Sequence, residues 1–110
     1  MKAGRIQGMT VKRRDVLDTY RSLKLRVPDT VYAFMDTAFA TFYMADAHVV
    51  HALQPDVPIE RERTDFCCLH RIRFQALHWL FGARGLRCRI VRHRRLPSGI
   101  FAYRAEEPDC

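Results

Sequence analysis

The densest group of side chains that could do chemistry is a run of arginines between residues 84 and 95. Six arginines and His93 fall within these twelve residues, and no acidic residue interrupts them. Arginine binds phosphates and carboxylates through two parallel hydrogen bonds, so the run is typical of a surface for an anionic partner. The six are Arg84, Arg87, Arg89, Arg92, Arg94 and Arg95. A structural role stays open for Arg87 and Arg89, because charged residues on a strand also keep a sheet edge from aggregating.

A second polar group precedes this run in a segment with helical periodicity. Arg71, Gln75 and His78 are spaced i, i+4 and i+7, which places them on one face of a helix. Such side chains hydrogen bond to base edges as well as to phosphates. We therefore predict a nucleic-acid-binding site made of these three residues and the six arginines.

Metal and catalytic chemistry have less support in the sequence. His48, His51, Cys67, Cys68 and His70 are of the types that bind zinc, but the sequence has no Cys-x-x-Cys pair. We interpret them as buried cysteines and ordinary histidines, and we predict no metal site and no cofactor. The sequence also lacks a phosphate-binding glycine loop and a serine nucleophile elbow, so we expect no enzymatic activity.

One resemblance supplies a minor enzymatic alternative. The pairs Arg73 with His78 and Arg71 with His78 match the loose Arg-x4-6-His spacing, and in this the chain resembles the all-helical HEPN ribonucleases. The resemblance implies that the basic residue positions RNA while the histidine moves a proton.

Three helices are expected to position these residues. The first, from Thr10 to about Leu25, follows a tail over residues 1–9 that we expect to be disordered. Its apolar stripe contains Val16, Tyr20 and Leu23. The second and longest helix is predicted over 28–54, where apolar residues keep helical spacing, and a linker over 55–63 follows it. The third is predicted to begin at Thr64 or Asp65 and to end at Gly82 or Gly85.

After Gly85 the apolar period changes from 3.6 to 2, which predicts a β-hairpin with a turn over 94–99. The face formed by Leu86, Cys88 and Ile90 must pack on the helices or extend a sheet, because an isolated hairpin is marginally stable. We therefore predict an α+β fold, with three helices followed by a C-terminal β-hairpin, in one domain over residues 10–110.

This order of elements resembles a winged-helix DNA-binding domain over residues 64–105. The resemblance is carried by the stretch from Leu77 through Gly85 to Val91, and by Pro97 to Arg104. It implies a winged-helix-like fold in which a recognition helix runs through a glycine into a basic β-wing. The function that it implies is DNA binding.

Length and composition limit the class of protein. The chain has 110 residues, enough for one domain, and its net charge of +7 comes from 16 arginines and three lysines against 12 acids. No apolar run approaches the roughly 18 residues of a membrane-spanning helix, and residues 1–10 lack the apolar centre of a secretory signal. We expect a cytoplasmic protein.

Two functions fit these observations. The first is a small basic regulator that binds the phosphate backbone of nucleic acid through the arginine-rich hairpin. The alternative is an inhibitor or adaptor, encoded by a phage or mobile element, that binds a host protein complex, as an anti-defence or anti-CRISPR protein does. Its contact surface would be an acidic face made of Asp29, Asp36, Asp46 and Asp56. A second copy could pair with the edges of the hairpin, so a homodimer is a further expectation.

Overall fold

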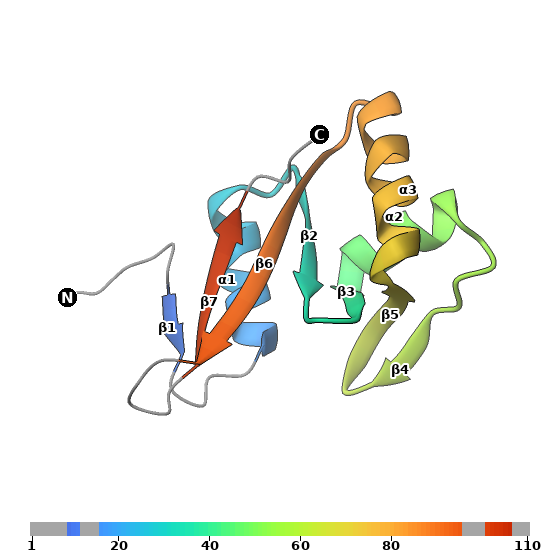
Figure 1. The fold of residues 1–110 in the computed structure, drawn as a ribbon. Helices are drawn as coiled ribbons and strands as arrows, with labels where there is room; N and C mark the ends of the chain where they lie inside the picture. Colours follow the sequence, from blue (N-terminus) through green and yellow to red (C-terminus); the bar gives the residue numbers. More distant parts are fainter. Residues whose placement is uncertain (1–8, 12–15, 96–100, 107–110) are drawn as a thin grey trace.

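A mixed β-sheet of seven strands carries helices on both faces (Figure 1). The computed structural model describes residues 9–11, 16–95 and 101–106, and the side chains of residues 16–92. The elements in chain order are β1 (Met9–Val11), α1 (Val16–Arg26), β2 (Thr30–Met35), β3 (Phe39–Tyr43), α2 (Met44–Leu53), β4 (Glu60–Glu62), β5 (Thr64–His70), α3 (Arg71–Ala83), β6 (Arg87–Arg95) and β7 (Phe101–Glu106). The strand order is β1-β7-β6-β2-β3-β5-β4. β6 runs parallel to β2, and the other neighbouring strands are antiparallel.

This architecture contradicts the predicted winged-helix-like order of three helices followed by one hairpin, because the strands alternate with the helices. The predicted helix over 28–54 is wrong in its first half, where β2 and β3 form a hairpin, and correct over α2. The third helix begins at Arg71, later than predicted, because Thr64–His70 forms strand β5. It ends as predicted at Gly85, whose φ of 72° and two hydrogen bonds, Gly85 N–H to Gly82 O and Leu86 N–H to Phe81 O, close the helix.

The error over 28–54 has a physical cause in strand β2. All six of its residues are buried, since helices cover both faces of the sheet at this strand. A strand buried on both sides shows no alternation of apolar and polar residues, so its pattern does not distinguish it from a buried helix. A local signal for the turn does exist, because the Asp36 Oδ1 atom accepts hydrogen bonds of 2.7 Å from the N–H groups of both Ala38 and Phe39.

The predicted hairpin exists, but it is part of the seven-stranded sheet rather than a separate wing. β6 lies between β7 and β2, and β7 pairs on its other side with β1 (Figure 1). β2 pairs with residues 87–92 of β6, and β1 pairs with residues 101–103 of β7, so each outer edge of the hairpin is paired over part of its length. The homodimer expected from pairing at these edges stays a prediction. The predicted packing of its apolar face is confirmed, because Cys88 and Ile90 are buried against α3 and Leu86 packs beside them. Most of the predicted turn, residues 96–100, lies outside the described part of the chain.

The first face of the sheet is covered by α1 through its predicted apolar stripe. The predicted start of this helix at Thr10 is wrong, because Met9–Val11 forms strand β1 and α1 begins at Val16. Val16, Tyr20 and Leu23 pack against Tyr32, Phe34 and Val91 of the central strands. The Tyr20 and Phe34 rings lie 6.5 Å apart between centroids, and the Phe34 and Tyr43 rings lie 5.3 Å apart in an edge-to-face arrangement.

On the second face, α3 packs around the fully buried Phe42 of β3. Its Phe74 and Phe81 rings lie 6.1 Å and 6.3 Å from the Phe42 ring, between centroids. Leu77 and the α2 residue Val50 complete this core. The helix α3 therefore packs on β3 through Phe74 and Phe81, and it also covers the buried Cys88 and Ile90 of β6.

A buried ion pair completes the edge of β2 that β3 leaves open. β3 pairs with β2 only at Phe34 and Met35, because the chain then turns into α2. Asp46 of α2, 1% exposed, fills the gap: its Oδ2 accepts a 2.9 Å hydrogen bond from the Tyr32 N–H. Lys24 Nζ donates to Asp46 Oδ1 at 2.9 Å and to the Thr30 carbonyl oxygen at 2.7 Å. The network ties α1, β2 and α2 together, and it shows that the expected exposure of Asp46 is wrong.

We expect Lys24→Met to destabilise the fold by about 3 kcal/mol at pH 7, because it leaves the buried Asp46 carboxylate without its counter-charge. Burial already raises the pKa of Asp46 above its ordinary value. The folded state therefore holds the Asp46 proton to higher pH than the unfolded state, and stability falls as pH rises through the folded pKa. The loss caused by Lys24→Met should accordingly be smaller at pH 5 than at pH 7 in urea unfolding.

Asp18→Ala is the control, because Asp18 forms an exposed pair with Arg21. It should change the free energy of unfolding by less than about 0.5 kcal/mol at both pH values. An equal loss for Lys24→Met at both pH values would contradict this account.

Candidate functional site

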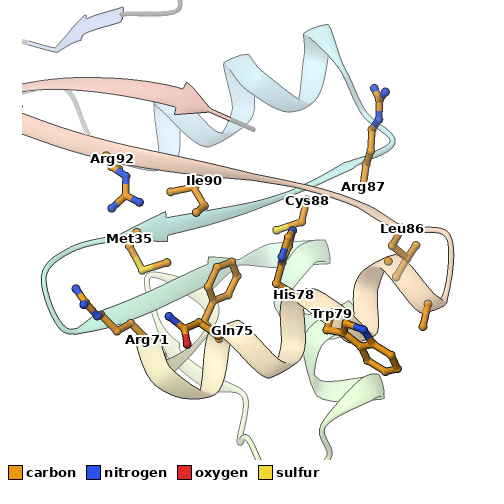
Figure 2. A pocket seen from close by; sticks show the side chains of 13 residues that line it. Met35, Arg71, Gln75, His78, Trp79, Leu86, Arg87, Cys88, Ile90 and Arg92 are labelled. Carbon is orange, nitrogen blue, oxygen red and sulfur yellow. The ribbon is translucent and has the colours of Figure 1, made fainter. Parts of the chain in front are cut away.

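An open groove of about 840 Å³ lies between α3 and β6 (Figure 2). We call it the α3–β6 groove. Its lining consists of Met35, Arg71, Phe74, Gln75, His78, Trp79, Gly82, Ala83, Leu86, Arg87, Cys88, Ile90 and Arg92. Arginine, glutamine and histidine are the polar members among the described residues that line it, and none of those is an aspartate or glutamate. Such a lining attracts anions.

The structure places all three predicted residues of the third helix in the groove. Arg71, Gln75 and His78 follow one another along the side of α3 that faces β6 (Figure 2). Arg71 begins the helix directly after β5, and its Nη1 donates a 3.3 Å hydrogen bond to the Thr37 carbonyl oxygen. His78 stacks at 5.9 Å, between ring centroids, on the buried Phe74. Helical spacing alone was sufficient to group these side chains.

The six predicted arginines are divided by the pleat of β6. Arg92 faces the groove near Arg71, and Arg87 lines it at the other end with its side chain directed away from α3 (Figure 2). Arg89 pairs in register with Tyr32. Burial raises the pKa of the Tyr32 hydroxyl, and the positive charge of Arg89 opposes this rise, so Arg89 lies on the α1 side of the sheet. Arg84 is exposed at the end of α3, outside the lining. Arg94 and Arg95 end strand β6, where the side chains lie outside the described residues.

Two arginines outside the predicted site, Arg61 and Arg73, are bound to carboxylates away from the groove. Arg73 Nη2 donates to Asp56 Oδ1 at 2.6 Å, and Arg61 Nη1 donates to Asp65 Oδ1 at 2.7 Å. The hydrogen bond from Arg73 lowers the pKa of Asp56, and the one from His48 lowers that of Asp65. Of the two ribonuclease-like pairs, only Arg71 and His78 therefore share the groove. Because Asp46 is buried and Asp56 holds Arg73, the expected acidic docking face does not form as predicted.

The histidines and cysteines that could have bound zinc are used in separate contacts. His48 Nε2 lies 2.8 Å from Asp65 Oδ2, and His51 Nδ1 lies 2.8 Å from the Val57 carbonyl oxygen. Cys67 is fully buried with its Sγ atom 3.8 Å from the Ala47 carbonyl oxygen, and burial raises its pKa to about 12. A thiol with such a pKa stays protonated and is a poor metal ligand and nucleophile.

Trp79 lines the groove and was not among the residues predicted from the sequence. It is 74% exposed at the rim, on the same helix as Gln75 and four residues after it. The same i, i+4 spacing that grouped the polar residues would have included it. Met35 and Ile90, which line the groove beneath the two arginines, come from neighbouring strands and could be brought together only by the sheet pairing.

We expect two substitutions on α3 to differ strongly in their effect on the free energy of unfolding. Phe81→Ala should cost about 3 to 5 kcal/mol, because the ring is fully buried against Phe42. Trp79→Ala should change the free energy of unfolding by less than about 0.5 kcal/mol, because the indole is largely in solvent. Urea unfolding of the two variants measures both values. A large loss for Trp79→Ala would mean that the side chain supports the core rather than the groove.

The described residues contain neither a metal-binding cluster nor a membrane-spanning helix. Within the described residues, no group of three or more His, Cys, Asp or Glu side chains could hold a metal ion. None of the three described helices is long and apolar enough to cross a bilayer. No protein-family model and no curated protein matches the sequence.

Proposed function

We propose that the protein binds nucleic acid through the α3–β6 groove and holds the phosphate backbone with Arg71 and Arg92. The observation that carries this proposal is the composition of the lining, in which both arginines stand beside Gln75 and His78. Among the described lining residues there is no carboxylate. Arginine pairs with phosphate oxygens bidentately, and glutamine and histidine add hydrogen bonds to phosphate or sugar. The net charge of +7 adds long-range attraction for a polyanion.

The distribution of carboxylates supports the same proposal. Asp56 and Asp65 are bound to Arg73 and Arg61 on the α2 and β4 side of the molecule, where they neutralise basic residues. These two carboxylates therefore do not neutralise Arg71 or Arg92. A phosphate chain along the groove would meet arginines on both walls, one from α3 and one from β6. Such binding is expected to depend on salt and to depend little on sequence.

We expect binding of nucleic acid to weaken steeply as salt rises from about 50 to 200 mM, because phosphate contacts release counterions. Arg71→Ala and Arg92→Ala should each weaken binding at low salt and reduce the slope of log K against log salt by about 0.7 to 0.9. Fluorescence anisotropy with labelled DNA and RNA measures both quantities.

Arg21→Ala is the control matched in charge. Arg21 lies on α1, which covers the opposite face of the sheet, and it is more than half exposed. Removing it should leave the slope unchanged. Absence of any binding at about 50 mM salt, or an equal effect of Arg21→Ala, would reject the proposal and favour a protein partner.

A further inference from the structure

The outward face of α3 is unsuited to reading a DNA duplex. A recognition helix reads base edges with polar side chains on the face that enters the major groove. On α3 the exposed large apolar residues are Ile72 and Trp79, which are 69% and 74% exposed, and Ala76 between them is also exposed. The polar residues Arg71, Gln75 and His78 are instead turned toward the junction of the helix with the sheet (Figure 2). A duplex lying on α3 would meet apolar side chains, while these hydrogen-bonding groups would stay beside β6.

The groove itself combines surfaces for bases with surfaces for phosphates. Arg71 and Arg92 lie at one end, and Trp79 lies near the other, with His78 between them (Figure 2). Met35, Phe74 and Ile90 give the groove an apolar lining. Its volume of about 840 Å³ is within the range of sites that enclose a small ligand, so it has room for unstacked bases. The bases of a duplex are paired and stacked and could not reach this lining.

We infer that the α3–β6 groove binds single-stranded nucleic acid, with a base stacked on Trp79 and the flanking phosphates on Arg71 and Arg92. This inference rests on the proposed function and specifies its ligand. An aromatic platform next to a basic groove is the arrangement that binds single strands without sequence preference, because every base has a flat π-face. Arg71 and Arg92 of the lining complement the negative charge of the strand, whereas an uncharged apolar segment of a protein would make no use of them.

Trp79 is the only tryptophan in the chain, so its fluorescence reports directly on stacking. We expect oligo(dT) and oligo(U) of about 12 nucleotides to quench this fluorescence at about 50 mM salt. They should bind at least about tenfold more tightly than a duplex of equal length. Heparin, a polyanion without bases, should bind without comparable quenching.

Substitutions of Trp79 separate stacking from charge. Trp79→Leu should weaken binding of single strands by about 5- to 100-fold and leave heparin binding unchanged, whereas Trp79→Phe should stay within about threefold of the native protein. Ile72→Ala is the matched control, since Ile72 is equally exposed on the same helix but does not line the groove. It should not change binding.

The outcomes distinguish this inference from the proposed function. Equal affinity for duplex and single strand, or binding without quenching of Trp79, would overturn the single-strand assignment and leave nucleic-acid binding in place. Equal losses for Ile72→Ala and Trp79→Leu would also overturn it, because the exposed face of α3 would then be the contact. Failure of every nucleic acid to bind at low salt would overturn both.

Discussion

Strand β2 is the constraint on which the rest of the structure depends, because it is buried on both faces and along both edges. Its α1 side packs on Tyr20, its opposite side faces α2 and α3, and β6 pairs along one edge. The other edge is completed by β3 for two residues and then by the Asp46 carboxylate. A buried N–H without an acceptor is costly, so this carboxylate fixes where α2 lies, and Lys24 balances its charge.

The position of α3 follows from its aromatic side chains and creates the groove. Phe74 and Phe81 pack on Phe42 of β3, and the same helix also packs on the buried Cys88 and Ile90 of β6. The exposed side of α3 and β6 form the two walls of the groove, with an apolar base. Each wall contributes an arginine, and the nearby carboxylates are bound elsewhere, to Arg73 and Arg61. Packing of the core thus decides both the shape and the charge of the site.

Several elements could be predicted from local pattern alone. The stripe of α1, the helix of α3 from Arg71 to its glycine stop, and the hairpin after Gly85 all have a clear period or a clear terminator. Residues 30–43 could not be predicted in this way, because a strand buried on both faces has no alternation to detect. The helix predicted over residues 64–70 was wrong for a related reason. Phe66 and Leu69 fit a helical period by chance, whereas Cys67 and Leu69 are the two residues buried on one face of β5.

The sequence by itself determined which side chains share one face of α3, because helical spacing places Arg71, Gln75 and His78 together regardless of what surrounds the helix. It also determined the excess of positive charge. Only the tertiary structure decided that Arg92 faces these residues while Arg89 lies on the opposite face of the sheet, and that β6 is an internal strand rather than a projecting wing. The physical reason is that strand neighbours are set by long-range pairing and by burial on both faces, which depend on residues far apart in the chain.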